Sequence, residues 1–312
     1  MLLGIDFEDW DQLMARRYAN PGWDRPSQAL ERQTAVLLDL LDELRARATF
    51  FILGMSGRHH PDLLTEVAAR GHELASHGYD HRPIAEHTPA TFAEDLARSR
   101  EVVESAGAPP PLGYRAPGFS LGREQTWALP VIRAAGFRYE SSLYDSPLLR
   151  GRLRPVAATP YRHRLGDGDG LWAVPLAVAP VGPARMPVAG STYWRVLPPP
   201  ALRSLLRRQW ASAPVCPLYF HPYDFDPWPV DIALAPGATG RQRRGARRQV
   251  RLHRLSPGRV TAALRELSSA VSFRTYGEAV AEASPVGASD VGASEAMASD
   301  AMALRSPAVG RP

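Results

Sequence analysis

Short apolar runs alternate with segments of helical periodicity along most of this chain. Residues 2–7 (LLGIDF) and 48–53 (ATFFIL) are apolar runs of strand length, and residues 28–46 between them repeat apolar positions at steps of three and four. Such steps place one apolar stripe along a helix, so a strand–helix–strand unit is predicted. The same alternation predicts further strands at residues 72–76, 112–116, 137–141, 171–176 and 215–221.

Helix boundaries are marked by proline, threonine and glycine between these runs. Pro61 and the pair Thr88–Pro89 stand where two helices begin, and Gly71 and Gly107 stand where they end. Further helices are predicted near residues 123–135 and 200–211.

Strands that alternate with helices are expected to be parallel and joined by right-handed crossovers. About seven such strands predict an irregular (β/α) barrel that resembles a TIM barrel, with an open doubly wound sheet as the alternative. No glycine-rich phosphate loop follows residues 2–7, which argues against a nucleotide-binding fold.

The C-terminal segment differs from the rest of the chain. Residues 284–312 repeat VGAS and consist mainly of Ala, Ser, Gly and Pro, so they cannot bury enough apolar surface to offset the entropy of ordering. We therefore expect one domain over residues 1–283 and a disordered tail over residues 284–312. Residues 234–258 are rich in Gly and Arg, and a long surface excursion is expected there.

The composition is typical of a soluble globular protein, because 45% of the residues are hydrophobic and 22% are charged. All 37 basic residues are arginine, so we attribute the net charge of +5 to a general composition bias. The single cysteine, Cys216, cannot form an internal disulfide. The sequence shows no signal-peptide pattern and no apolar run of membrane-spanning length, so a cytoplasmic location is expected.

Polar residues gather at the C-terminal ends of four predicted strands. In an α/β barrel these ends lie on one face, and that face carries the active site. Each of these residues has an ordinary structural explanation when taken alone, but their shared position favours a site. They are Asp6, Glu8 and Asp9 after the first strand, His77 and His81 after the third, Arg115 in the fourth, and His221 at the end of the last.

Two histidines and a carboxylate form a common ligand set for a divalent metal with open coordination positions. His77, His81 and Asp9 are the expected ligands here, and Zn²⁺ is the expected metal. Zinc strongly lowers the pKa of a water molecule that it binds, and either Glu8 or Asp6 is expected to accept the proton of that water.

Two further groups would complete the chemistry. His221 is expected to protonate a leaving group, and backbone N–H groups near Gly118 are expected to face an oxyanion. Together these parts predict metal-assisted hydrolysis of an amide or an ester.

In these residues the sequence resembles the polysaccharide deacetylase superfamily, which has the NodB homology domain and includes carbohydrate esterase family 4. It is most similar to the branch associated with bacterial exopolysaccharide export and exosortase gene clusters. The resemblance runs from about residue 3 to about residue 280. It rests on DFEDW, RATFFILG, RGHELASHGYDHRPI, GYRAPGFSL, GFRYESSLY, MPVAGSTYWR and LYFHPYDFDP. The resemblance implies a NodB-type barrel that removes acetyl groups from the N-acetylated sugars of a polysaccharide.

The resemblance also implies roles for single residues. The adjacent acids of the family's first motif match Glu8 and Asp9, so Asp9 becomes a metal ligand, and either Glu8 or Asp6 becomes the base. The remaining matches are His77 and His81 to the metal histidines, Arg115 to the arginine that orients the base, Pro117-Gly118 to the oxyanion segment, His221 to the catalytic acid, and Glu140 loosely to an Asp that steadies that histidine.

Aromatic residues in the matching segments are expected to contact sugars. Phe119, Tyr193 and Trp194 are the expected substrate-lining residues, and Trp10, Tyr144 and Trp228 are further candidates for stacking, with ordinary packing as the alternative for each.

The arginine cluster of residues 241–254 is compatible with nucleic acid, but no recognised nucleic-acid motif accompanies it, so we expect no nucleic-acid partner. Contact of this cluster with an anionic membrane surface or an acidic glycan stays open. Besides a polysaccharide deacetylase, the sequence is compatible with a hydrolase of a small cyclic amide or of an O-acetyl ester, and with an inactive carbohydrate-binding relative.

Overall fold

The computed structural model describes residues 1–18, 23–24, 27–143, 145, 157–165, 170–256 and 258–283. The predicted tail, residues 284–312, lies outside the described residues. The strands are β1 (Leu2–Phe7), β2 (Thr49–Ile52), β3 (Glu73–Ser76), β4 (Gly113–Tyr114), β5 (Tyr139–Glu140), β6 (Tyr161–His163), β7 (Leu171–Ala173), β8 (Val178–Val181), β9 (Ala184–Pro187) and β10 (Pro217–Phe220).

Helices connect most of these strands. The α-helices are α1 (Trp10–Arg17), α2 (Ala29–Glu43), α3 (Gly54–His59), α4 (Pro61–Ala69), α5 (Pro89–Ser105), α6 (Ala128–Ala134), α7 (Ser191–Val196), α8 (Pro199–Ser212), α9 (Gly240–His253), α10 (Arg259–Ser268) and α11 (Tyr276–Ala283). Short 3₁₀ turns are η1 (Ile84–Glu86), η2 (Pro117–Phe119), η3 (Arg123–Gln125) and η4 (Pro222–Asp224).

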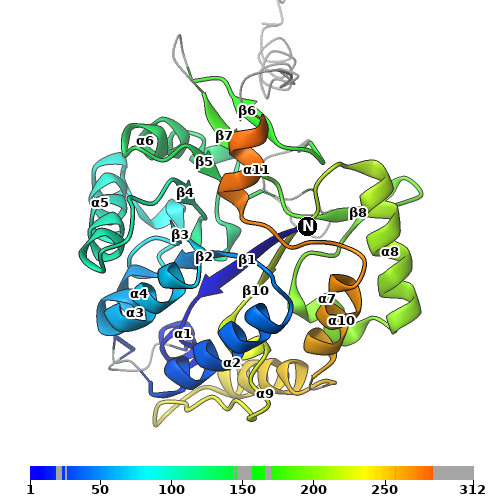
Figure 1. Cartoon of the computed structure of the whole chain (residues 1–312). Helices are drawn as coiled ribbons and strands as arrows, with labels where there is room; N and C mark the ends of the chain where they lie inside the picture. Colours follow the sequence, from blue (N-terminus) through cyan, green and yellow to red (C-terminus); the bar gives the residue numbers. More distant parts are fainter. Residues whose placement is uncertain are drawn as a thin grey trace, which may run out of the picture.

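One curled sheet forms the centre of the molecule, in the order β10-β1-β2-β3-β4-β5-β7-β6 (Figure 1). The strands from β10 to β7 are parallel, and β6 is antiparallel to β7. After β7 the chain returns to the first edge, where the Ala177 N–H donates to the Pro217 carbonyl of β10 at 2.9 Å. The prediction of an irregular (β/α) barrel with about seven parallel strands is therefore confirmed.

Strand β1 is buried on both faces, and the alternating direction of its side chains decides which of them point into the barrel. Leu3, Ile5 and Phe7 join the largest core cluster together with leucines of α2. The even-numbered positions face the other way, because Leu2 packs with Phe51 and Tyr276 instead. Successive side chains of a strand point to opposite faces, so polar residues at even positions of β1 point into the barrel.

The structure contains elements that the sequence pattern did not predict. Strand β6 and the antiparallel hairpin of β8 and β9 were missed, and β8 and β9 contain Pro180 and Pro187. Proline cannot donate to a ladder of hydrogen bonds, so the pattern argued against strands there. The predicted single helix near residues 123–135 is a 3₁₀ turn followed by the shorter helix α6.

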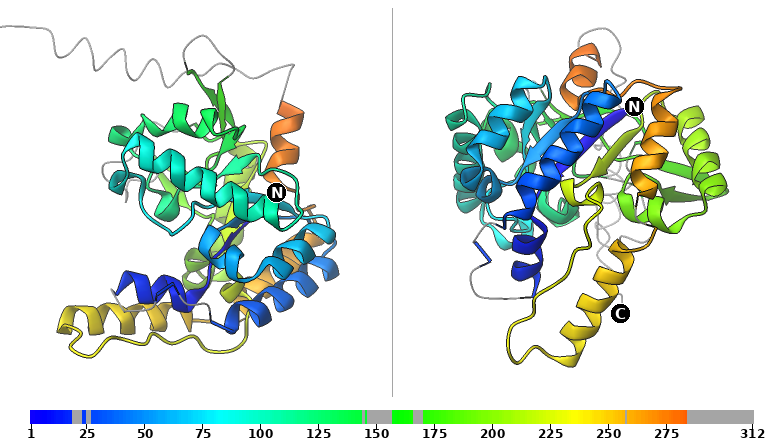
Figure 2. Two further views of the ribbon diagram at one scale, coloured as in Figure 1. Left: turned by 90° about the vertical axis from the view of Figure 1, so that its left-hand side faces the viewer. Right: turned by 60° about the horizontal axis from the view of Figure 1, so that its bottom comes forward.

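The expected surface excursion contains helix α9, which lies at the C-terminal side of the barrel near α1 (Figure 2). Thr239 caps this helix: its hydroxyl accepts the Gln242 N–H at 3.2 Å, and the Gln242 side chain accepts the Thr239 N–H at 2.8 Å. No α-helix in the described part of the chain is both long and apolar enough to cross a membrane.

Candidate active site

The C-terminal end of β1 delivers two carboxylates into the barrel. Asp6 and Glu8 are two positions apart, so both continue the inward-facing set of β1. Asp6 is 3% exposed and Glu8 is 2% exposed. Buried carboxylates require charged or hydrogen-bonding partners, and each of these two has a different set.

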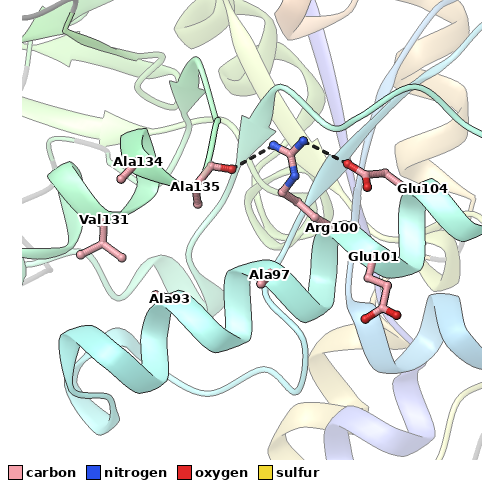
Figure 3. A pocket seen from close by; sticks show the side chains of 8 residues that line it. All are labelled: Ala93, Ala97, Arg100, Glu101, Glu104, Val131, Ala134 and Ala135. Atoms are coloured by element: carbon pink, nitrogen blue, oxygen red, sulfur yellow. Dashed lines mark hydrogen bonds and ion pairs between the residues drawn. The ribbon is translucent and has the colours of Figure 1, made fainter.

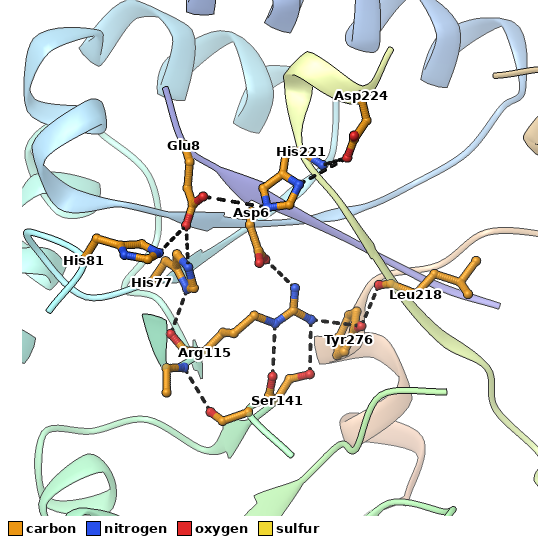
Figure 4. A network of polar contacts seen from close by, with 12 residues as sticks. Asp6, Glu8, His77, His81, Arg115, Ser141, Leu218, His221, Asp224 and Tyr276 are labelled. Carbon is orange, nitrogen blue, oxygen red and sulfur yellow. Dashed lines mark hydrogen bonds and ion pairs between the residues drawn. The ribbon is translucent and has the colours of Figure 1, made fainter. Parts of the chain in front are cut away.

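Glu8 lies between two histidines that follow β3. One carboxylate oxygen, Oε1, is 2.8 Å from His77 Nε2 and 2.9 Å from His81 Nε2 (Figure 4). Potential ligand atoms of the three residues all lie within 4.8 Å of one another. Burial by itself disfavours the charged carboxylate, but the two imidazole rings hold the pKa of Glu8 well below its usual value.

A hydrogen bond to the backbone fixes the ring of His77, and the backbone conformation of His81 directs the other ring. His77 Nδ1 lies 2.9 Å from the Arg115 carbonyl oxygen, which can only accept, so Nδ1 carries a proton and Nε2 is the ring nitrogen that faces Glu8. His81 has a φ of +61°, a left-handed conformation that costs a non-glycine residue free energy and that turns its ring back toward His77.

The structure places Asp9 apart from this cluster. Its Oδ1 accepts the N–H groups of Asp11 and Gln12 at 2.8 and 3.2 Å, and its Oδ2 accepts the Ser27 N–H at 2.8 Å. Asp9 is thus the N-cap of α1. The fold brings Glu8, and not the expected Asp9, to the two histidines, because β1 directs even-numbered side chains inward.

Asp6 pairs with Arg115 at the centre of the barrel. The Arg115 Nη1 donates to Asp6 Oδ1 at 2.5 Å, and the guanidinium, which is fully buried, lies 3.7 Å from the centre of the Phe51 ring. Burial opposes this charge, but Asp6 and Tyr276 raise the pKa of Arg115. Gly4 makes room for the pair, since a Cβ there would lie 2.9 Å from Arg115 Nη2.

The rest of the Arg115 side chain is held from two distant elements. Its Nε and Nη2 donate to the backbone carbonyl and the hydroxyl of Ser141, at 3.0 and 3.1 Å. The Tyr276 hydroxyl of α11 accepts from Nη2 at 3.0 Å and donates to the Leu218 carbonyl at 2.9 Å. Sequence reasoning missed Ser141 and Tyr276, because no local pattern links them to Arg115.

The Tyr276 hydroxyl gives a first test of this geometry. In Tyr276→Phe the Leu218 carbonyl loses one donor and Arg115 loses one acceptor, so we expect the free energy of unfolding to fall by about 1–3 kcal/mol. We also expect kcat to fall about tenfold while KM changes little, because the guanidinium is no longer fixed. Chemical denaturation and steady-state kinetics measure the two effects.

Tyr139→Phe is the matched control for this variant. The Tyr139 hydroxyl is also buried, but it donates to Glu73 Oε1 at 2.8 Å and is not bonded to Arg115. It should lose stability without the tenfold loss of kcat. Equal losses of kcat in both variants would contradict a specific link between Tyr276 and Arg115.

His221 approaches Glu8 from β10. Its Nε2 is 3.7 Å from Glu8 Oε2, and its Nδ1 is 3.1 Å from Asp224 Oδ2. Burial disfavours the charged ring, but Asp224 and Glu8 raise the pKa of His221 to about 9. The pKa of Asp224 is lowered in turn: burial opposes its charge, and His221 and Arg195 more than offset that effect.

Asp224 therefore occupies the place that was expected for Glu140. The Glu140 carboxylate instead lies 3.1 Å from His163 Nε2 and accepts the Ser142 N–H at 2.7 Å, so within the described residues it is paired away from His221. The spacing His221-x-x-Asp224 is the sequence signal for the true partner, since η4 is a single turn that returns the carboxylate to the histidine.

The residues that were expected to line the substrate have different surroundings in the structure. Gly118 and Phe119 have φ values of +57° and +53°, so the backbone turns sharply after β4, and the Phe119 N–H donates to the Ala116 carbonyl within this turn. Tyr193 is half-buried and packs against the core. Trp194 is a core residue: it is 0% exposed, and its indole N–H donates to the Val188 carbonyl at 2.7 Å.

The remaining aromatic candidates also differ among themselves. Trp10 is buried and donates to the Asp231 carbonyl at 2.7 Å, so it packs as a structural residue. Trp228 is 65% exposed, with the Arg32 guanidinium 5.2 Å from its ring centre. Tyr144 lies outside the described residues.

The donor set of Glu8, His77 and His81 fits a divalent cation such as zinc. Two imidazole nitrogens and one carboxylate oxygen are the ligands that zinc prefers at sites with an open position. Because His77 Nδ1 donates to a backbone carbonyl, Nε2 is the nitrogen that would bind the cation, and a buried carboxylate between two rings suits a positive charge at that point.

Two family models match the chain in succession. Residues 22–139 match the polysaccharide deacetylase model, and residues 142–281 match a domain of unknown function. Both segments contribute strands to the one sheet, since β2 to β4 lie in the first and β6, β7 and β10 lie in the second. The first model begins after Asp6 and Glu8, and it ends before His221.

Curated relatives align with a short part of the chain. A chitooligosaccharide deacetylase of Rhizobium leguminosarum bv. trifolii is 37% identical over 73 residues, which are 23% of this chain and 34% of that protein. A peptidoglycan-N-acetylglucosamine deacetylase of Bacillus cereus is 27% identical over 96 residues, 30% of this chain and 35% of that protein. The chain thus spans about a third of the length of these relatives.

One solved structure resembles this chain in fold over nearly its whole length. A Mycobacterium smegmatis protein assigned as a polysaccharide deacetylase has 21% sequence identity and a TM-score of 0.53, and the match covers 99% of this chain and 94% of that one. Residues 22–139 therefore form a domain of the polysaccharide deacetylase type, and the fold of the chain as a whole resembles that of the Mycobacterium smegmatis protein.

Proposed function

We propose that this protein is a metal-dependent deacetylase that removes N-acetyl groups from the sugars of a polysaccharide. The observation that carries the proposal is the convergence of three groups on one point: the Glu8–His77–His81 cluster, the Asp6–Arg115 pair and the His221–Asp224 pair (Figure 4). The substrates named for the relatives, chitooligosaccharide and the N-acetylglucosamine of peptidoglycan, share an N-acetylhexosamine unit.

Glu8, His77 and His81 hold the cation in this proposal. When bound there, a divalent cation would supply Lewis-acid polarisation of the acetyl carbonyl and a more acidic water. Glu8 therefore takes the ligand role that was expected for Asp9, and Asp6 is left as the base. Asp9 caps the N-terminus of α1 and has no catalytic role in this proposal.

Asp6 accepts the proton of the attacking water. Its carboxylate lies between Arg115 and the Glu8 cluster, and Arg115 fixes one of its oxygens (Figure 4). Positioning of this kind reduces the entropy lost on reaching the transition state.

His221 donates a proton to the departing amine. Asp224 holds Nδ1, so Nε2 carries the mobile proton, and it points toward Glu8. Such an acid is worth about 10²–10⁴ in rate. The base and the acid are different side chains with different partners, so one proton can be accepted while another is donated.

Acetate release tests this function directly. We expect release from oligomers of N-acetylglucosamine and from N-acetylated exopolysaccharide, loss of release with a chelator, and recovery when Zn²⁺ is returned. O-acetylated xylan provides the comparison for ester hydrolysis. Release that a chelator does not affect would contradict metal dependence, and release from the ester alone would favour the O-acetyl esterase alternative.

We also propose an exopolysaccharide as the physiological polymer. The support is the resemblance of residues 186–195 (MPVAGSTYWR) to the exopolysaccharide branch. This segment supports the site and does not line it, because Arg195 donates to Asp224 Oδ1 at 3.1 Å and Trp194 is buried.

A further inference from the structure

Helix α9 is a strongly basic element at the rim of the site. Between Asp231 and Glu266 the sequence has nine arginines and no acidic residue. Six of these arginines lie in α9: Arg241, Arg243, Arg244, Arg247, Arg248 and Arg251. All six are exposed.

These arginines differ from other surface arginines in lacking carboxylate partners. Arg265 pairs with Glu43 at 2.7 Å, and Arg203 pairs with Glu266 at 2.9 Å. Throughout the described part of the chain, by contrast, no carboxylate lies within ion-pair distance of an α9 arginine. The charge of α9 is therefore available to an external anion.

Three of these arginines, Arg243, Arg247 and Arg251, line a groove of about 570 Å³ between α9 and the loop before it, together with Arg254. Guanidinium groups form one wall, Ile232, Leu234 and Val250 give apolar surface, and Asp231 contributes one carboxylate. A groove between α5 and α6 has a different character, since its Arg100 already donates to Glu104 and to the Ala135 carbonyl (Figure 3). Only the first of these two grooves presents uncompensated positive charge.

The segment of residues 231–254, which carries α9, is held beside the site at both of its ends. At its start, the Asp231 carbonyl accepts the indole N–H of Trp10, two residues after Glu8. At its end, Arg195 bridges the His253 carbonyl at 2.7 Å and Asp224 Oδ1 at 3.1 Å. The groove is therefore fixed relative to the Glu8 cluster and the His221–Asp224 pair.

The beginning and the end of this segment are also hydrogen-bonded to each other. Arg254 donates two hydrogen bonds to the Val230 carbonyl, at 3.1 and 2.9 Å. A chain that leaves the site along the rim would meet the arginines of α9 in a defined order, since residues three and four apart share one face of a helix.

We propose that the α9 groove binds an acidic glycan, namely a polysaccharide that carries carboxylate groups beside its N-acetylated sugars. This inference rests on the proposed function for its link to the site. A sugar acid offers carboxylates to the guanidinium groups, hydroxyls to Asp231, and apolar ring faces to Ile232 and Leu234.

The same features favour a glycan over membranes and nucleic acids. Helices that lie in a membrane interface carry Trp, Phe or Leu on their apolar face, and α9 carries a single Leu and no Trp or Phe. A nucleic acid presents a dense row of phosphates, which Asp231 would repel within the groove.

Binding of fluorescently labelled polygalacturonate oligomers to the full chain tests the inference. We expect affinity to fall steeply as salt is added, and the double variant R247E/R251E to bind on the order of tenfold or more weaker. The matched control is R207E/R208E on α8, which makes the same change in net charge on exposed residues elsewhere and should bind as the parent does. Unchanged melting temperatures would show that both variants are folded.

Three results would overturn the inference. Equal weakening in both double variants would show an effect of net charge alone. Binding to phosphatidylserine vesicles without binding to polygalacturonate would assign α9 to a membrane surface, and preferential binding of duplex DNA would assign it to nucleic acid. Because this assay needs no turnover, its outcome is independent of the acetate-release assay that decides the proposed function.

Discussion

Under the proposed function, Glu8→Gln is expected to abolish both metal binding and deacetylation, whereas Asp9→Asn is expected to preserve both. The Glu8 carboxylate is the only acidic group that the described residues place between His77 and His81, and an amide is a far weaker ligand. We expect metal affinity to fall by at least about a hundredfold, beyond the usual effect of removing an outer-shell partner. Metal content after dialysis and acetate release measure the two losses.

Asp9→Asn is the matched control because both variants replace a carboxylate by the amide of the same size. Asparagine caps a helix about as well as aspartate, so α1 should remain folded. If Asp9→Asn lost the metal and Glu8→Gln retained it, the ligand role would return to Asp9, as the adjacent acids in the sequence suggested.

His221→Ala is expected to reduce turnover by at least about a hundredfold while the metal stays bound. The histidine lies 3.7 Å from the far oxygen of Glu8, so its loss removes the proton donor and leaves the cluster of Glu8, His77 and His81 intact. Metal content and kcat, measured on the same preparation, separate the two roles. Loss of the metal in this variant would contradict the assignment of His221 as an acid.

Asp224→Asn refines this test. The Asp224 carboxylate is a principal cause of the raised pKa of His221, and it also fixes the ring through Nδ1. With the amide in place the ring is still present, so we expect a smaller loss of turnover than in His221→Ala. A variant with full activity would remove Asp224 from the catalytic apparatus.

The fold could be predicted well because the barrel strands are buried and follow each other in sequence. Runs such as LLGIDF and ATFFIL carry their signal locally, and helix α2 between them has a clean apolar stripe. Prediction failed where strands are short or contain proline, as in the hairpin of β8 and β9. There the tertiary setting, and not local preference, decides the structure.

The candidate site could be predicted as a set of segments but not residue by residue. The ends of β1, β3, β4 and β10 do meet, and Asp6, His77, His81, Arg115 and His221 lie there together. The choice between Glu8 and Asp9 depends on where β1 ends and α1 begins. Because a side chain in a strand changes face at each residue, an uncertainty of one residue in that boundary exchanges the two carboxylates.

Other contacts of the site have no local signal at all. Tyr276 reaches Arg115 across 161 positions of sequence, and one sequence gives no means of pairing them. Trp194 belongs to a segment whose resemblance suggested a sugar groove, yet the short helix α7 turns its ring into the core. Exposure of an aromatic residue is a property of packing, and sequence reasoning cannot supply it.

The order of the strands has a consequence for biosynthesis. Strand β1 pairs on one side with β2, but its other partner, β10, joins residues 2–5 to residues 217–220, and Tyr276 is made later still. While the chain emerges from the ribosome, β1 therefore presents one unpaired edge, and such edges attract other chains. The yield of active protein is expected to depend on shielding that edge, by a chaperone or by slow translation at low temperature, until α11 has left the ribosome.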